Sequence, residues 1–218
     1  MSPAHRGRNR WSWVALAGAA LLLSVPADAQ SRVSLRGFGD IGWTTFAAKQ
    51  SFAAVLGSET GRLLGGGVDV VVARRVFVTL RASRFRDVGQ RVFLFDGAQF
   101  NLGIPTTITL TPLELTAGYR LDRGWRVVPY GGAGISRHRY EEVSAFAEDS
   151  ENVDDRFSGY HVLGGAELRL AQWLGAALEA QWTTVPDALG DDPNSVSRAF
   201  NESDLGGVTL RLKVIVGR

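Results

Sequence analysis

Residues 158–187, SGYHVLGGAELRLAQWLGAALEAQWTTVPD, decide the fold. They contain two runs, 160–170 and 174–183, in which apolar or small residues alternate with polar ones. A period of two is typical of a β-strand, because successive side chains point to opposite faces. Only three residues separate the runs, so they predict an antiparallel hairpin. Each run matches the roughly 9–11 residues that a tilted strand needs to cross a bilayer.

Six further alternating runs give eight in all. We expect strands at 33–48, 62–73, 76–85, 106–121, 125–140, 160–170, 174–183 and 204–216. Their connections alternate between short turns and long loops, and the long loops are expected at 49–60, 87–105, 141–155 and 187–203. This pattern predicts an all-β protein, an eight-stranded antiparallel up-and-down transmembrane β-barrel, which closes because an open sheet edge cannot lie in lipid. In 106–121 the alternation changes phase near Pro112, where we expect a β-bulge.

The first 29 residues have the three parts of a secretory signal peptide. A basic start, HRGRNR, precedes an apolar run over 11–25, and Ala27-Asp28-Ala29 provides a small-residue cleavage site. The apolar run is shorter than the roughly 20 residues of a membrane-spanning helix. We therefore expect residues 1–29 to be a cleaved signal peptide and residues 30–218 to form a single exported barrel domain.

The composition excludes several classes of protein. The 218 residues are 45% hydrophobic with a mean hydropathy of zero, which excludes a disordered chain and a helical membrane protein but not a half-apolar barrel. Of the 24 Lys and Arg and the 22 Asp and Glu, three and one respectively lie in the expected signal peptide. The remainder is balanced, so nucleic acid is not an expected partner. Because the chain has no Cys, disulfides and thiolate chemistry are excluded.

The two faces of the expected strands differ in chemistry. One is mainly aliphatic, with aromatic residues near its ends at Trp43, Tyr119, Tyr160 and Trp182, and such aromatic girdles indicate a lipid-facing exterior. On the seventh strand, Leu178 is assigned to lipid and Gln181 to the lumen. The other face carries six basic and five acidic residues: Arg36, Asp40, Asp69, Arg81, Glu114, Arg120, Glu167, Arg169, Glu179, Arg211 and Lys213. In a narrow interior these charges have to pair, so we expect a structural network that fills the lumen.

Three segments resemble a known family. They are PYGGAG at 129–134, the hairpin GGAELRL…LEAQW, and LGGVTLRL at 205–212. They resemble the small outer-membrane β-barrel domain proteins, the OmpA/OmpX/OmpW-like group. The resemblance implies a monomer in the bacterial outer membrane, inserted by the barrel-insertion machinery and in contact with outer-membrane lipids and lipopolysaccharide. It also implies a structural, adhesive or envelope-interaction role through long extracellular loops.

Two alternative functions stay open. One is a narrow channel or transporter for small or hydrophobic solutes. The other is an outer-membrane lipid-modifying enzyme, because Ser136 and His138 share a strand face and His161 points to the lumen. The surrounding motif of a lipid hydrolase is absent, so we expect no enzyme, no cofactor and no metal site. The acidic loop 141–155 lacks the spacing of a calcium loop and is expected to be solvated.

Overall fold

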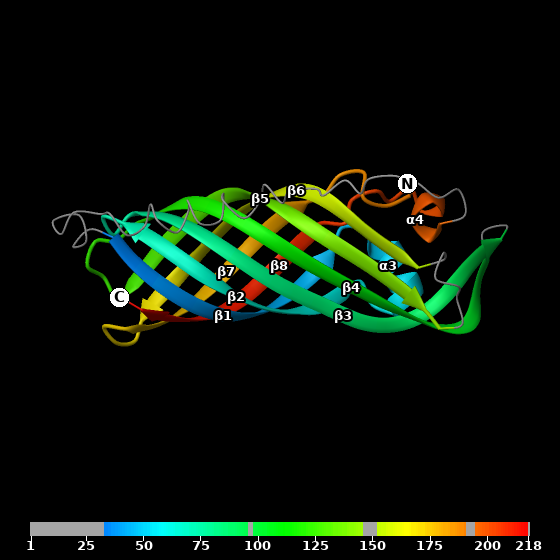
Figure 1. Ribbon diagram of the computed structural model, residues 1–218, viewed down its shortest axis with the longest axis horizontal. Coiled ribbons are helices and arrows are strands. Elements are labelled where there is room, and N and C mark those ends of the chain that lie inside the picture. The colour runs from blue at the N-terminus through cyan, green and yellow to red at the C-terminus, as the bar shows by residue number, and fades with distance from the viewer. Residues whose placement is uncertain (1–32, 96–97, 146–151, 191–194, 218) are drawn as a thin grey trace, which may run out of the picture.

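The strands form a closed barrel. A computed structural model describes residues 33–95, 98–145, 152–190 and 195–217, and the expected signal peptide lies outside these ranges. Each strand pairs antiparallel with the next, and β1 closes the ring with β8 (Figure 1). The strands are β1 (Val33–Phe46), β2 (Thr60–Val72), β3 (Val76–Phe95), β4 (Ala98–Arg120), β5 (Val127–Ser144), β6 (Val153–Arg169), β7 (Leu174–Thr184) and β8 (Gly207–Gly217). The predicted eight-stranded, all-β up-and-down barrel is confirmed.

The two ends of the barrel differ. The connections β2–β3, β4–β5 and β6–β7 are short and define the turn end, where β1 also begins and β8 ends. The opposite, loop end carries two short helices, α3 (Lys49–Leu56) and α4 (Val196–Ala199). Figure 1 shows α3 within the ring of strands at this end. No helix in the described ranges is long and apolar enough to cross a membrane.

All four of the expected long loops contain regular structure, and 187–203 contains α4. Residues 87–95 and 98–105 form the outer part of the β3–β4 hairpin, which projects beyond the other strands in Figure 1. Residues 49–60 contain α3, and 141–155 is shortened because β5 runs to Ser144 and β6 begins at Val153. These loop predictions were wrong because a hairpin outside the membrane needs no apolar face, so its sequence does not alternate.

The predicted bulge at Pro112 is also wrong. Pro112 pairs with His138 in an unbroken β4–β5 register, and the shift in β3–β4 pairing falls between Gln90 and Val92 instead. Ile108 and Leu110 are buried on the same inward face as Glu114. The phase of the strand is therefore constant, and the lumen itself changes from charged to apolar along its length.

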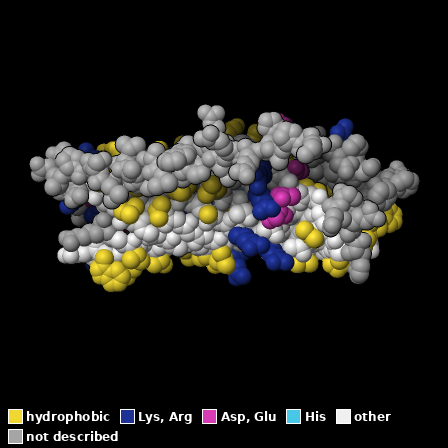
Figure 2. All heavy atoms as spheres, viewed as in Figure 1, with side chains coloured by type: hydrophobic (Ala, Val, Ile, Leu, Met, Phe, Trp, Pro, Cys, Tyr) yellow, Lys and Arg dark blue, Asp and Glu magenta, His cyan; other side chains and the backbone are white. Residues whose placement is uncertain are grey.

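The outer wall is apolar over the middle of the strands. The exposed fraction is 65% for Leu35 and Ile135 and 50% for Leu178, whereas the inward Gln181 is 1% exposed. Figure 2 shows apolar side chains spread along the visible wall, with a group of basic and acidic side chains toward the loop end. An exposed apolar area of this extent is stable where lipid covers it. We call the exposed apolar side chains of the outer wall, such as Leu35, Ile135 and Leu178, the apolar belt.

Candidate functional site

The middle of the lumen is filled by an ion-pair cluster around Arg81. Its guanidinium lies 2.7 Å from Glu179 Oε1 and 3.3 Å from Glu114 Oε2, and it donates a 3.1 Å hydrogen bond to Gln181 Oε1. Asp40 Oδ2 lies 3.3 Å from Arg81 Nε without the alignment of a hydrogen bond, so that contact is electrostatic attraction. All five side chains are buried, so the cluster closes the lumen at this height.

Arg211 and Lys213 on β8 complete this central cluster. Arg211 donates a 2.5 Å hydrogen bond to Gln181 Oε1 and lies 3.4 Å from Glu114 Oε1. The Lys213 ammonium is 3.5 Å from Glu179 Oε2. Three cations thus face three carboxylates, with the Gln181 amide placed between two guanidiniums. A buried group of this kind holds together only while each charge keeps its partners.

A second cluster lies nearer the turn end. Arg36 bridges Asp69 at 3.0 Å and Glu167 at 2.8 Å, and Arg120 binds the same Glu167 oxygen at 2.9 Å. Thr79 Oγ1 donates a 2.6 Å hydrogen bond to Asp69. These contacts join β1, β2, β3 and β4 to Glu167 of β6 on the other side of the lumen. This cluster therefore fills the cross-section of the lumen at a second height.

An aromatic layer between the two clusters was not predicted. The Phe38 ring lies 4.1 Å from the Lys213 ammonium and 5.4 Å from the Arg81 guanidinium carbon, within cation–π range. Tyr130 donates a 3.0 Å hydrogen bond to Glu179 and packs edge-on against Phe77. The signal was present in the sequence, because Phe38 has the same strand phase as Arg36 and Asp40.

The structure places ten of the eleven expected lumenal charges in these two clusters and puts Arg169 elsewhere. Arg169 has the inward phase, but its side chain is 36% exposed and binds Asp122 in the β4–β5 turn. Arg169 therefore faces the turn end of the lumen, paired with Asp122 but outside the two clusters, because β6 has already reached the turn end at this residue. Burial acts to raise the pKa of Asp122, but hydrogen bonds from Arg169 and the Gly124 amide bring it below its ordinary value.

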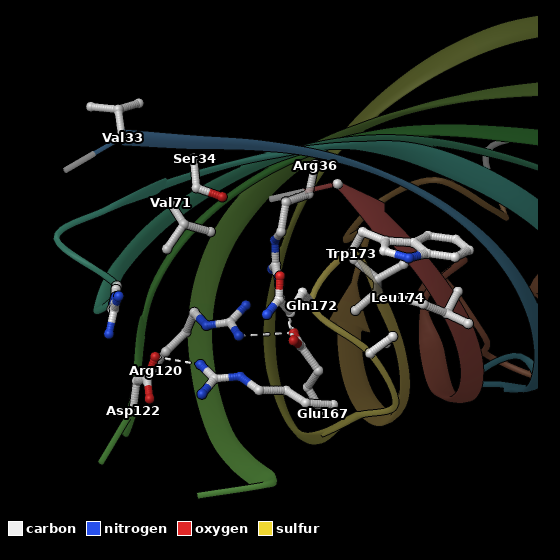
Figure 3. Close-up of a pocket in the computed structure, with 16 residues that line it drawn as sticks. Val33, Ser34, Arg36, Val71, Arg120, Asp122, Glu167, Gln172, Trp173 and Leu174 are labelled. Atoms are coloured by element: carbon white, nitrogen blue, oxygen red, sulfur yellow. Dashed lines mark hydrogen bonds and ion pairs between the residues drawn. The ribbon is translucent and has the colours of Figure 1, made fainter. Parts of the chain in front are cut away.

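A vestibule of about 700 Å³ occupies the turn end of the lumen. Figure 3 shows Arg36, Arg120 and Glu167 converging at its inner side, with Trp173 and Leu174 at the other. Its wall combines arginines with apolar side chains of β1, β2 and β8. The Arg36–Glu167–Arg120 contacts form its floor, so the vestibule does not continue into the central cluster.

The loop end of the lumen is closed by an apolar plug that includes α3. Phe52 of α3 stacks on Phe46 with ring centroids 3.8 Å apart, and Phe46 meets Phe85 edge-on at 5.2 Å. The plug consists of Phe46, Ala48, Phe52, Leu63, Phe85, Ile108, Leu110, Tyr140, Val185, Ala188 and Leu205. Glu202 fixes the helix by accepting hydrogen bonds from the Gln50 and Ser51 amides at 3.0 and 2.8 Å. A carboxylate at a helix N-terminus satisfies donors that lack a partner within the helix.

Ser136 and His138 lie together but do not form a catalytic arrangement. Ser136 Oγ is 2.9 Å from His138 Nε2, while His138 Nδ1 has no hydrogen-bond partner to orient the ring. Both residues are buried beneath the plug, and His161 is bonded to Thr116 Oγ1 at 2.8 Å. A nucleophile and its base also need an orienting group and access for substrate. Within the described ranges, no group of three His, Asp or Glu side chains could hold a metal ion.

The four expected girdle aromatics point outward. Their exposed fractions are 47% for Trp43, 45% for Tyr119, 55% for Tyr160 and 48% for Trp182. Tyr119 lies near the turn end, one residue before the end of β4. The Tyr160 and Trp182 rings are in contact near the loop end, with centroids 6.4 Å apart. The aromatics thus occur toward both ends of the apolar belt.

An apolar exterior, a closed ring of eight strands and a filled polar interior define the class of small membrane-spanning β-barrels. A family model, the outer membrane protein beta-barrel domain, matches residues 15–205. The chain belongs to this family, and it is a bacterial outer-membrane protein.

Solved structures share the fold at low sequence identity. OprG of Pseudomonas aeruginosa is 12% identical with a TM-score of 0.57, over 86% of this chain and 96% of that one. Neisserial surface protein A is 15% identical with a TM-score of 0.54, over 84% and 96%. Ail of Yersinia pestis, crystallised with the heparin analogue sucrose octasulfate, is 10% identical with a TM-score of 0.50, over 86% and 99%. No curated protein matches the sequence.

Proposed function

We propose that this protein is a non-conducting surface barrel that acts through its loop end, in adhesion or in contacts within the envelope. The observation that carries the proposal is the filling of the lumen. The Arg36 cluster, the Arg81 cluster and the apolar plug occupy successive heights of the interior. The inner wall is therefore committed to packing, which leaves the outer surface to interact with partners.

The β3–β4 hairpin is the most prominent part of that surface. It pairs out to Phe95 and Ala98 and carries exposed apolar residues such as Phe100 and Leu102, 51% and 50% exposed. Long loops of outer-membrane barrels face the cell exterior, which would place this hairpin outside the cell. An ordered hairpin loses less conformational entropy on binding a partner than a flexible loop does.

The channel alternative would need a continuous path through the same interior. Both charge clusters and the plug would have to move for a solute to pass from one end to the other. The vestibule offers space only at the turn end, above the floor formed by Arg36, Glu167 and Arg120. These features favour the surface role over transport.

Shortening the hairpin tests the proposal. Gly89 and Thr106 are paired, so residues 90–105 can be replaced by Asn-Gly, which forms a two-residue hairpin turn. We expect this variant to assemble in the outer membrane, while attachment of cells to a heparin-coated surface falls to the level of the deletion strain. The surface is chosen because Ail was crystallised with a heparin analogue.

The control is Arg123→Asn, which places the same Asn-Gly pair in the β4–β5 turn at the other end of the barrel. This variant should keep wild-type attachment. Because the chain has no Cys, a Leu102→Cys variant labelled by an impermeant maleimide on intact cells reports that the hairpin is outside. Full attachment by the shortened variant, with uptake of a small solute depending on the protein, would favour the channel instead.

A further inference from the structure

The outer wall beside the loop end carries a band of exposed arginines. They lie on β2, β3, β5 and β6 and flank the threonine-rich stretch of β4. Their outward direction follows from the burial of the residues beside them in sequence, such as Leu63, Phe85 and His138. We call them the arginine band: Arg62, Arg84, Arg86, Arg137, Arg139 and Arg156.

The strand register brings these like charges together. Arg139 and Arg156 are directly opposite each other on β5 and β6. Arg62 and Arg86 each lie one residue beyond the Leu63–Phe85 pair of β2 and β3. Like charges placed opposite each other across two strands are destabilising. The arrangement therefore calls for anions that offset the repulsion.

The acids of the chain offset only part of this charge. Arg139 forms a two-pronged hydrogen bond with Asp154 at 2.9 and 2.8 Å and lies 3.0 Å from Glu141. Among the described residues, the other five arginines of the band form no ion pair with a carboxylate. The band therefore keeps an excess of positive charge that is open to an external anion.

The band lies at the edge of the apolar belt. Arg62 pairs with the girdle residue Trp43, and Arg137 is two residues along β5 from Ile135, which is 65% exposed and opposite Tyr160. Tryptophan and tyrosine on the outside of a barrel sit at the level of the lipid headgroups. The guanidiniums just beyond them are thus at the height of headgroup phosphates.

We propose that the arginine band binds the phosphate groups of lipopolysaccharide in the outer leaflet. Guanidinium groups match phosphate oxygens with paired hydrogen bonds, which an ammonium cannot do. The phosphates supply the missing counter-charge, and the acyl chains lie along the neighbouring belt. The inference names a lipid partner for the envelope role proposed above and rests on the loop end facing outward.

The experiment uses the purified, refolded full barrel in detergent containing EDTA, so that divalent cations cannot bridge protein and phosphate. Lipopolysaccharide is titrated against wild type and against Arg84→Gln/Arg139→Gln/Arg156→Gln. A basic residue beside an anionic lipid surface contributes about fivefold in affinity, so we expect about a hundredfold loss for three. The control Arg74→Gln/Arg75→Gln/Arg126→Gln makes the same change in net charge at the turn end and should stay within about twofold of wild type.

Further arms identify the ligand. We call Arg84→Gln/Arg139→Gln/Arg156→Gln the band variant. Dephosphorylated lipopolysaccharide should bind to wild type as weakly as intact lipopolysaccharide binds to the band variant. Equimolar inorganic phosphate should not compete with lipopolysaccharide for wild type. Asp154→Asn removes an internal acid and should bind at least as tightly as wild type. Without lipid, the band variant should be no less stable to urea than wild type, because repulsion between arginines has been removed.

Four results would overturn the inference: equal losses in the two triple variants, undiminished binding of the dephosphorylated lipid, a marked loss of stability in the band variant, or preference of the band for heparin over lipopolysaccharide. Because purified protein is used, the outcome is independent of the attachment assay. A failure here would leave the hairpin proposal standing, and the reverse also holds.

Discussion

Replacing Arg81 by Met is expected to lower the free energy of unfolding by about 3–5 kcal/mol, because breaking a buried ion pair leaves uncompensated charge in the interior. Arg81 is 1% exposed and contacts Asp40, Glu114 and Glu179, each of them also buried. Without it, three carboxylates share Arg211 and Lys213. Methionine keeps much of the volume of the arginine side chain, so little of the loss in the free energy of unfolding comes from a cavity. Most of it comes from the carboxylates that have lost a cation. The measurement is a urea titration in lipid vesicles, with the folded fraction read on an unboiled gel.

Two matched variants separate charge pairing from general damage. Arg169→Met removes a partly exposed arginine from the turn end, where an ion pair is worth at most about 1 kcal/mol. Arg81→Met/Glu179→Gln removes both members of the 2.7 Å pair and should recover part of the lost stability. If Arg81→Met were as stable as wild type, the central cluster would not hold the barrel together.

Replacing Leu178 by Arg is expected to cost about 2–4 kcal/mol and to reduce assembly in cells, because a lipid-facing charge near the bilayer midplane has no water or partner. Leu178 is 50% exposed on the outer wall, midway along β7 and opposite Leu212 on β8. The same change at Thr107, on the outward face of β4 beyond the belt, is the control and should cost less than about 1 kcal/mol. Heat-modifiable gel mobility and urea titration measure both variants.

The outcome of the Leu178 comparison tests which face meets lipid. A larger loss for Thr107→Arg than for Leu178→Arg would place the bilayer at the wrong height or the wrong face. Gln181, three residues from Leu178, is not a tolerant lumenal control, because it lies between Arg81 and Arg211 with its amide bonded to both. A third guanidinium at this position would meet two others at short range.

The barrel itself could be predicted because lipid imposes a strict pattern. Every strand segment in the membrane must alternate, and every turn between paired strands must be short or long according to its side. The same rule explains where prediction failed. The outer part of the β3–β4 hairpin and α3 lie beyond the apolar belt, where neither alternation nor an apolar face is required.

The lumen could be predicted in its charge but not in its layering. Strand phase alone places the carboxylates and guanidiniums inward, yet it does not say at which height each lies. The register between neighbouring strands fixes the height of each side chain. It separates the Arg36 cluster from the Arg81 cluster and places Arg169 at the turn end. In β4 the alternation alone indicates a change of phase, because Ile108 and Leu110 of the apolar plug point inward, where polar residues are expected.

Electrical conductance across a planar lipid bilayer tests the filled lumen most directly. The refolded wild-type barrel, shown to be folded by its heat-modifiable mobility, is inserted beside an open porin as a positive control. We predict no sustained current steps from this protein at neutral pH, because the Arg36 cluster, the Arg81 cluster and the plug each close the path. Stable steps of reproducible size from the folded wild-type protein would contradict the account and establish a channel.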